Sequence, residues 1–206
     1  MLWTIAALLL SYLLGSIPTA YLFGRALKGI DIRKAGSGNV GATNALRVLG
    51  KGAGITVLLV DILKGFIAVT LLAEFFVNKP VLWQVQNLRI FMGLGCICGH
   101  NWTIFLRFKG GKGIAASFGV LLGLSMKVPG LNIVMGLIVL TWLLVFFSSR
   151  MVSLASIIAA LALPILCLFF KQPFPLIAVS LLLCIFVIIR HKANLARIFQ
   201  GKEPRL

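Results

Sequence analysis

The sequence contains few charged residues and almost no acidic ones. Only 12% of its 206 residues are charged, and 20 Lys and Arg stand against 4 Asp and Glu. The carboxylates, at Asp31, Asp61, Glu74 and Glu203, are too scattered to form the oxygen cage that binds Mg²⁺ or Ca²⁺. We therefore expect no metal site and no cofactor.

Cysteine motifs are missing as well. Cys96, Cys98, Cys167 and Cys184 all lie inside apolar stretches, without a second pair or histidines at zinc-finger spacing. We interpret them as packing residues. Residues 1–14 lack a basic start and a small-residue cleavage site, which predicts a retained helix rather than a signal peptide.

Long apolar runs are what the sequence has in abundance. Hydrophobic residues make up 60% of the chain, and the mean hydropathy is +1.07. Both values lie outside the range of ordinary soluble domains. Because a helix needs roughly 20 residues to cross the hydrocarbon core, the length allows about six or seven spans and little else. We predict an all-α integral membrane protein with a single polytopic domain over residues 1–206.

Polar connections divide the chain into seven apolar segments, of which the fourth is too short to span comfortably. The segments lie at about 4–24, 53–77, 85–104, 114–127, 131–148, 151–170 and 175–190. Placing the odd-numbered connections on one side of the membrane gathers most of the Lys and Arg residues there, and the positive-inside rule makes that side cytoplasmic. We expect about seven transmembrane helices, an external N-terminus and a cytoplasmic C-terminus.

The cation excess by itself is compatible with nucleic acid, anionic lipid or an anionic substrate. Nucleic acid is not expected, because the chain has no soluble basic domain and its loops offer no aromatic stacking platform. Topology alone is enough to explain cations such as Arg25 and Lys51. Asp61 and Lys64 stand three residues apart in the second apolar segment and can pair on one helical face. A functional and a structural role for this pair both remain open.

The first polar connection contains a glycine-rich loop, Gly-Ser-Gly-Asn-Val-Gly-Ala-Thr-Asn-Ala-Leu-Arg at 36–47. Glycines permit positive φ and let successive N–H groups form a concavity that holds phosphate. Ser37 and Asn39 add donors, and Arg47 offers a planar bidentate partner. A helix starting near residue 41 would direct its N-terminal amides at the same anion. The alternative is a flexible linker.

A second loop reads Arg-Phe-Lys-Gly-Gly-Lys-Gly at 107–113 and runs directly into a small-residue helix start at Ile114. It is not a Walker A loop, because Leu106 stands where the first glycine should be and Gly113 replaces the Ser or Thr. This pattern favours phosphate binding and excludes a P-loop nucleotidase. A structural turn that carries topology charges is the alternative.

The third element is Arg-His-Lys-Ala-Asn at 190–194. A helix leaving the membrane here would bring His191 and Asn194 onto adjoining faces. His191 is a candidate acid, base or oxyanion donor, with a solvated interfacial histidine as the alternative. Ser153 is either a polar group pointing toward the cationic side or a helix-packing serine.

Together the three elements, with Gly201 and Glu203 after the third, resemble the bacterial acyl-phosphate:glycerol-3-phosphate acyltransferase family over essentially the whole chain. The resemblance implies a seven-helix enzyme that moves a fatty acyl group from acyl phosphate to the sn-1 hydroxyl of glycerol 3-phosphate. The products are lysophosphatidic acid and phosphate, in the first step of phospholipid synthesis. The soluble-type acyltransferase signature, His followed five residues later by Asp, is absent, since His100 leads to Phe105 and His191 to Ala196.

The resemblance also implies site residues. The implied catalytic residues are Ser37, Arg47, Lys112, His191 and Asn194. The implied phosphate-binding residues are Gly36, Ser37, Gly38, Asn39, Asn44, Arg47, Lys109, Gly110, Gly111, Lys112, Gly113 and Ser153. Either His191 or a substrate phosphate would accept the hydroxyl proton. Acyl phosphate, glycerol 3-phosphate, the bilayer and the acyl-phosphate-forming enzyme are the expected partners of a monomer. Its active site would face the cytoplasm at a bacterial inner membrane.

Two other classes of function remain as alternatives. An anion transporter would also gather cations near membrane helices. However, the apolar segments hold only Asp61, Lys64, Glu74 and Arg89 as ionisable groups, and no broken-helix pair recurs in repeated halves. A structural lipid-binding subunit would tolerate alanine at Ser37 or His191, whereas an enzyme would lose activity.

Overall fold

A computed structural model describes residues 1–205, all of whose regular elements are helices. The chain forms two compact units, Met1–Leu124 and a second that begins at Ser125. This division into two compact units does not test the expectation of a single domain over residues 1–206, which stays a prediction.

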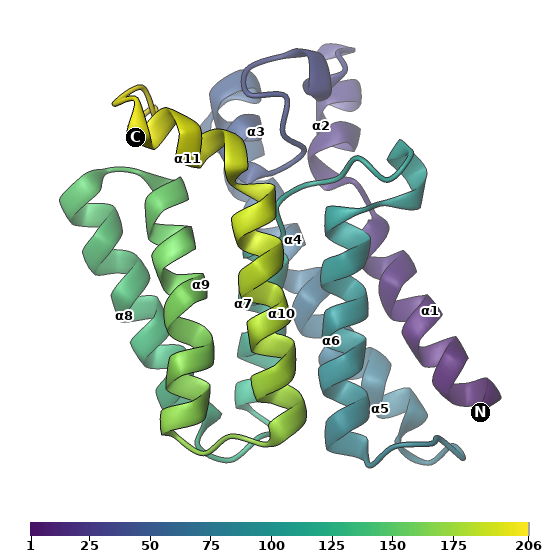
Figure 1. Cartoon of the computed structure of the whole chain (residues 1–206). Coiled ribbons are helices and arrows are strands. Elements are labelled where there is room, and N and C mark those ends of the chain that lie inside the picture. Colours follow the sequence, from purple (N-terminus) through teal and green to yellow (C-terminus); the bar gives the residue numbers. More distant parts are fainter. Residues whose placement is uncertain (206) are drawn as a thin grey trace. The chain divides into compact units, whose positions relative to one another are not determined.

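The first unit contains the longer part of the chain (Figure 1). Its elements are α1 (Leu2–Ser16), α2 (Thr19–Lys28), the 3₁₀ helix η1 (Ile32–Lys34), α3 (Ala42–Leu49), α4 (Lys51–Val69), α5 (Leu71–Val77), α6 (Val85–Asn101), η2 (Ile104–Leu106) and α7 (Ile114–Ser125). In this unit the segments between α2 and α4 and between α6 and α7 lie at one end, and the α5–α6 connection lies at the other.

Two of the predicted apolar segments are broken helices rather than straight ones. The segment predicted at 4–24 breaks at Ile17 and Pro18, because proline lacks the N–H that a continuous helix requires. The segment at 53–77 breaks at Thr70, whose φ of −107° and ψ of −88° lie outside helical values. Both breaks fall inside long apolar stretches and left no clear signal in the hydropathy pattern.

Close helix contacts in the first unit depend on glycine. A Cβ at Gly15 of α1 would collide with the backbone of Cys96 in α6, and one at Gly99 would collide with the Tyr12 carbonyl. Likewise a Cβ at Gly119 of α7 would collide with the Ile62 carbonyl of α4. Small residues at these positions let the helix backbones approach closely.

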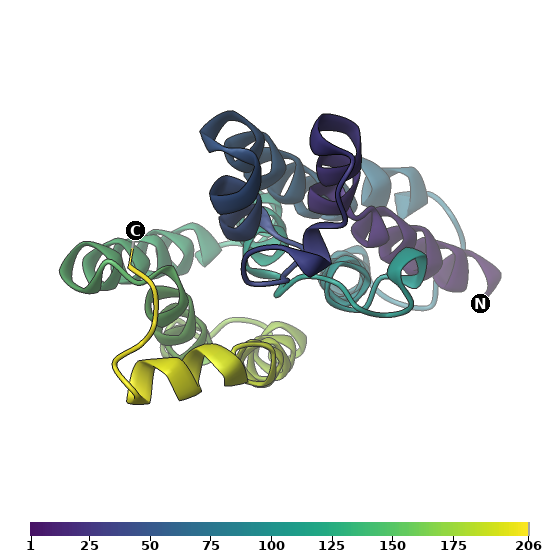
Figure 2. The ribbon, with the colours of Figure 1, turned by 90° about the horizontal axis from the view of Figure 1, so that it is seen from above.

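The second unit contains α8 (Leu131–Ser149), α9 (Val152–Phe169), α10 (Phe174–Arg190) and α11 (Lys192–Phe199). Arg150 turns the chain between α8 and α9 in the left-handed conformation, with φ of 59°. α10 and α11 are bent by 60° at His191, so that α11 lies across the end of α10 (Figure 2). The helix expected to leave the membrane at residues 190–194 is therefore interrupted by a bend, and His191 lies between the end of α10 and the start of α11.

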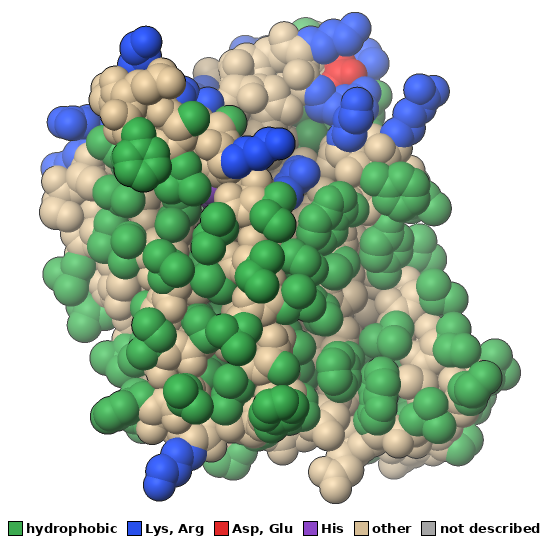
Figure 3. All heavy atoms as spheres, in the orientation of Figure 1, with side chains coloured by type: hydrophobic (Ala, Val, Ile, Leu, Met, Phe, Trp, Pro, Cys, Tyr) green, Lys and Arg blue, Asp and Glu red, His purple; other side chains and the backbone are tan. Residues whose placement is uncertain are grey.

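The described helices include several that are long and apolar enough to cross a membrane. Four stretches meet that description, at Leu2–Lys28, Lys51–Val77, Leu131–Ser149 and Val152–Phe169, and the bent pair α10 and α11 would make five. α7 is apolar but has only 12 residues, in agreement with the prediction that the fourth apolar segment is too short to span comfortably. Seven membrane crossings and the orientation of the termini stay predictions. Hydrophobic side chains cover the flanks of the helices, and in the first unit Lys and Arg side chains gather at the end that carries η1 (Figure 3).

Candidate functional site

The glycine-rich loop between η1 and α3 is closed by one buried side chain. The side-chain oxygen of Asn44, which is 1% exposed, accepts a hydrogen bond from the Ser37 N–H at 2.8 Å. Its Nδ2 donates to the carbonyls of Ala35 at 3.1 Å and Asn39 at 3.0 Å, and more weakly to Ile32 at 3.3 Å. The Asn44 amide is therefore occupied by the loop itself, which gives it a positioning role.

Two glycines let the loop follow this path. Gly36 and Gly38 have φ of 59° and 70°, where side chains are disfavoured. A Cβ at Gly36 would also collide with the Asn44 side chain, and one at Gly38 would lie 3.0 Å from the Arg33 carbonyl. The sequence requires glycine here because the chain turns tightly around Asn44, which rules out a merely flexible linker.

The predicted helix start near residue 41 is confirmed. Gly41 caps α3, which packs so closely on α4 that a Cβ at Gly54 would collide with Leu46. Ser37 and Arg47 are exposed, and Asn39 is half-buried. The first loop thus presents a hydroxyl and a guanidinium to its surroundings on a framework that Asn44 and α4 hold in place.

The second loop is fastened to the end of α6. The N–H groups of Gly110 and Gly111 donate to the carbonyls of Asn101 at 3.2 Å and His100 at 2.9 Å. A Cβ at Gly111 would collide with the His100 ring and would lie 2.9 Å from the Val40 carbonyl. The two glycine-rich loops therefore meet at Gly111. Since its amide and that of Gly110 bond to α6, we assign both glycines to shaping the loop rather than to a phosphate nest.

Lys112 follows these glycines and is half-buried. Gly113, with φ of 83°, then accepts a hydrogen bond from Ser117 at 2.7 Å and begins α7. The side chain of Lys109 instead lines a separate pocket beside η1. The structure thus divides the two lysines of this loop between different surroundings, which their spacing in sequence did not indicate.

A buried polar cluster lies behind this second loop. Asp61 and Lys64 of α4 form an ion pair at 2.8 Å, as their spacing predicted, and are 1% and 4% exposed. Thr19 donates to Asp61 at 3.0 Å, Lys64 donates to the Ile17 carbonyl at 3.2 Å, and His100 Nδ1 lies 3.7 Å from Asp61. The ion pair therefore stabilises the break between α1 and α2. It also lies next to His100, against which Gly111 packs.

In the second unit, one carboxylate collects three donors. Glu203 Oε1 accepts from Ser153 at 2.7 Å and Asn194 at 2.5 Å, while Oε2 accepts from Arg197 at 2.8 Å. Burial acts to raise the pKa of Glu203, but these three hydrogen bonds outweigh it, and the net effect is a lowered pKa. The ionised carboxylate thus fastens the C-terminal tail to α9 and α11.

His191 lies at the hinge between α10 and α11 and is 2% exposed. Its Nδ1 is 2.8 Å from the Val187 carbonyl, and since a carbonyl only accepts, Nδ1 must carry the proton. In the neutral ring Nε2 is then the basic nitrogen.

The predicted site residues are thus grouped within each unit. The first unit brings the two glycine-rich loops together, and the second brings together Ser153, His191 and Asn194. The role of Glu203 as their organiser was not predicted. Its signal was present, because Glu203 is one of only 4 acidic residues in the chain. The polar neighbours of Asp61, namely Thr19 and His100, lie too far apart in sequence for a spacing argument.

Comparison with known proteins decides the family. The model of the family described as "Glycerol-3-phosphate acyltransferase" matches residues 5–201. The chain belongs to this family.

Relatives and solved structures agree with that assignment. The glycerol-3-phosphate acyltransferase of Rippkaea orientalis is 46% identical over 213 residues, covering 100% of this chain and 95% of the relative. That of Synechocystis is 44% identical, covering 100% and 92%. The crystal structure of PlsY, an integral membrane glycerol 3-phosphate acyltransferase, in its glycerol 3-phosphate form matches with a TM-score of 0.85 at 35% identity, covering 98% of this chain and 95% of that one.

The chain is therefore an acyltransferase of an integral membrane family. The resemblance drawn from the three sequence elements is confirmed at this level. Phospholipid biosynthesis follows from the family's activity.

Proposed function

We propose that the protein transfers a fatty acyl group from acyl phosphate to the sn-1 hydroxyl of glycerol 3-phosphate, at the cytoplasmic face of a bacterial inner membrane. The observation that carries the proposal is the first glycine-rich loop. Asn44 holds it closed while Ser37 and Arg47 remain exposed, beside the loop that carries Lys112. A hydroxyl on a loop of fixed backbone and two cations suit the phosphate groups of both substrates. The solved PlsY structures are of glycerol 3-phosphate and lysophosphatidic acid forms, which support the same substrate and product here.

The chemistry needs no acyl-enzyme. The glycerol hydroxyl oxygen bonds to the acyl carbon, the bond from that carbon to the phosphate oxygen breaks, and phosphate leaves with the bond electrons. The hydroxyl proton passes to His191 Nε2 or to a substrate phosphate oxygen. Ser37, Asn39, Arg47 and Lys112 bind phosphate and stabilise its charge, while Gly36, Gly38, Gly110, Gly111 and Gly113 shape the loops. Positioning and charge stabilisation supply much of the rate.

The decisive experiment supplies purified protein with palmitoyl phosphate and glycerol 3-phosphate. We expect lysophosphatidic acid and inorganic phosphate in equal amounts, with the acyl group at sn-1 when the product is analysed by NMR. Parallel reactions contain acyl-CoA or acyl carrier protein as donor. Activity with those donors and none with acyl phosphate would reject the proposed donor.

A pair of variants tests the site. Arg47→Ala should raise the KM for a phosphate substrate, whereas Lys51→Ala, which removes a nearby exposed cation, should leave it unchanged. Equal values for both variants would remove Arg47 from the site. A structural lipid-binding subunit would show no turnover in any variant, and a transporter would move its anion across vesicles without consuming acyl phosphate.

Topology and assembly complete the proposal. Seven crossings, an external N-terminus and a cytoplasmic C-terminus predict that single cysteines introduced at Lys28 and Lys202 are labelled from the cytoplasmic side. One introduced at Lys79 should be labelled from outside. We propose that a monomer is active and that the acyl-phosphate-forming enzyme supplies its donor. Light scattering of active protein in detergent tests the monomer.

A further inference from the structure

The first unit contains a pocket of about 370 Å³ beside η1, and neither Ser37 nor Arg47 is among the residues that line it. Its lining comes from three elements and the segment after η2: Tyr21, Arg33, Phe105, Leu106, Arg107 and Lys109. Half of these residues are cationic, and Arg25 stands next to them with its guanidinium 5.5 Å from the Tyr21 ring centre. A pocket with this charge attracts an anion.

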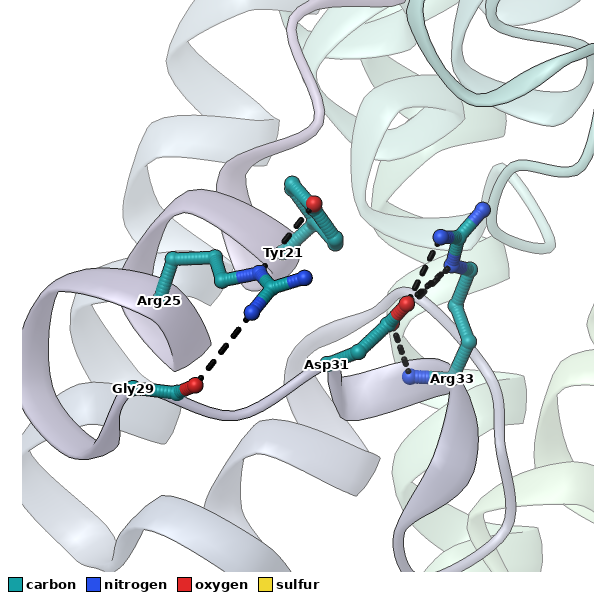
Figure 4. Close-up of polar contacts among 5 residues, drawn as sticks. All are labelled: Tyr21, Arg25, Gly29, Asp31 and Arg33. Carbon is teal, nitrogen blue, oxygen red and sulfur yellow. Dashed lines mark hydrogen bonds and ion pairs between the residues drawn. The ribbon is translucent and has the colours of Figure 1, made fainter.

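One side of the pocket is built rigidly. Asp31 accepts from Arg33 at 2.9 Å and 2.7 Å through two guanidinium nitrogens, and the same guanidinium lies 5.2 Å from the Tyr21 ring centre (Figure 4). Arg25 in turn donates to the Tyr21 hydroxyl at 3.2 Å and to the Gly29 carbonyl at 3.3 Å. The hydrogen bond from Arg33 lowers the pKa of Asp31 to about 2, so the carboxylate that orients Arg33 stays ionised at neutral pH.

The other side presents cations that the protein does not neutralise. Neither the Arg107 nor the Lys109 side chain forms a hydrogen bond or ion pair with any residue between 1 and 205. Asp31 is the one carboxylate near the pocket in that range, and it is already paired with Arg33. Arg107 and Phe108 also hold left-handed backbone, with φ of 53° and 59°, where residues other than glycine are strained. Such strain is typical of functional segments.

Apolar side chains next to these cations identify the kind of anion. Ile104, Phe105 and Phe108 are 49%, 59% and 58% exposed, on the same short segment as Arg107 and Lys109. A soluble phosphate would need the cations only. A membrane lipid carries a phosphate and acyl chains together, and cations beside exposed aromatic and aliphatic side chains match that combination.

We propose that this pocket binds the phosphate head group of an anionic phospholipid, with the acyl chains lying against Ile104, Phe105 and Phe108. This lipid site does not include Ser37 or Arg47. A lipid bound there, close to the loop that carries Lys112, would hold the first unit at the membrane surface. Arg33 of η1 and Arg107 of the segment after η2 both line the pocket and would bind the phosphate together. The interaction needs neither acyl phosphate nor glycerol 3-phosphate.

The test measures lipid binding to the full-length protein without substrates. Delipidated protein is titrated with phosphatidylglycerol in phosphatidylcholine mixed micelles, and bound lipid is counted by native mass spectrometry. Because a cation near a membrane surface contributes about 1 kcal/mol to anionic lipid binding, we expect about fivefold weaker binding for Arg107→Gln and about 25-fold for Arg33→Gln with Arg107→Gln. A Lys79→Gln, Lys127→Gln double variant removes the same charge elsewhere and should bind like wild type.

Two results of this experiment would overturn the proposed lipid site. Equal weakening in the Lys79 and Lys127 variant would reduce the effect to net charge and overturn the site. Displacement of the lipid by inorganic phosphate at equal concentration would assign the pocket to a soluble anion instead. If Arg33→Gln fails to fold, Arg107→Gln alone still tests the pocket, because its side chain has no partner to lose within the described chain. Acyl transfer is assayed separately, so failure of either proposal leaves the other standing.

Discussion

Each unit fastens its functional segment with one buried side chain, but the first unit uses a neutral amide and the second a carboxylate. Asn44 offers both an acceptor and donors, and it bonds to backbone groups within 12 residues of itself. Glu203 offers acceptors alone, and its partners are side chains up to 50 residues away. The amide closes a local loop, whereas the carboxylate joins distant helices.

The difference has energetic consequences. A neutral amide matched to backbone groups contributes modestly and does not titrate. A buried carboxylate depends on every one of its donors, because an unpaired buried charge is strongly unfavourable. We therefore expect the second unit to be the more sensitive to loss of its organiser and the only one of the two whose organiser responds to pH.

Loss of Glu203 should have the largest effect. Glu203→Ala leaves Ser153, Asn194 and Arg197 without their shared acceptor and should lower the free energy of unfolding by about 3 kcal/mol. Thermal unfolding in detergent measures the change, with Lys202→Ala as an exposed control in the same tail. Equal melting temperatures for the two variants would contradict an organising role.

Loss of Asn44 should rank next. Asn44→Ala removes the acceptor for Ser37 and the donor to the loop carbonyls, at a cost of about 2 kcal/mol. Activity should fall further than stability implies, by about 100-fold in kcat/KM, because the loop that presents Ser37 loses its fixed position. Thr43→Ala changes the neighbouring side chain, which forms no hydrogen bond within residues 1–205, and serves as the control. A folded Asn44→Ala protein with wild-type kinetics would remove the loop from the site.

The helical membrane fold, one buried ion pair and the family could be predicted from the sequence. Apolar length and charge predicted the helical membrane fold, and the three-residue spacing of Asp61 and Lys64 predicted their ion pair, because both depend on local periodicity. The resemblance of three short elements predicted the family. These are the properties that neighbouring residues determine.

The roles of Asn44 and Glu203, the hinge and the pocket could not be predicted, because they depend on contacts that local sequence patterns do not encode. Asn44 was predicted to bind phosphate, because an amide in a glycine-rich loop has the same appearance whether it faces a ligand or its own backbone. Glu203 acquires its role only when α9 brings Ser153 to it across 50 residues. The hinge at His191 was hidden because no proline or glycine marks it, and the pocket at Arg33 and Arg107 forms from segments far apart in sequence.

A change of pH should separate the two organisers. Because the folded-state pKa of Glu203 lies below its ordinary value of 4.5, its carboxylate stabilises the fold above that pH, and the stabilisation is lost as pH falls through the lowered pKa. The melting temperature of wild type should exceed that of Glu203→Gln near pH 7 and approach it in acid. The difference between wild type and Asn44→Ala should change less over the same range. A difference in melting temperature between wild type and Glu203→Gln that is constant with pH would contradict the stabilising role of the ionised Glu203 carboxylate.

The smallest effect should come from trimming one bond of the carboxylate. Ser153→Ala leaves Asn194 on Oε1 and Arg197 on Oε2, so we expect a loss of about 1 kcal/mol, a fraction of that for Glu203→Ala. Ser148→Ala is the matched control, because Ser148 is an exposed serine that bonds only to carbonyls of its own helix. If Ser153 also binds substrate phosphate, its KM for that substrate should rise beyond what the stability loss explains. An unchanged KM with the 1 kcal/mol loss would leave Ser153 as a serine that packs α9 and fastens the C-terminal tail.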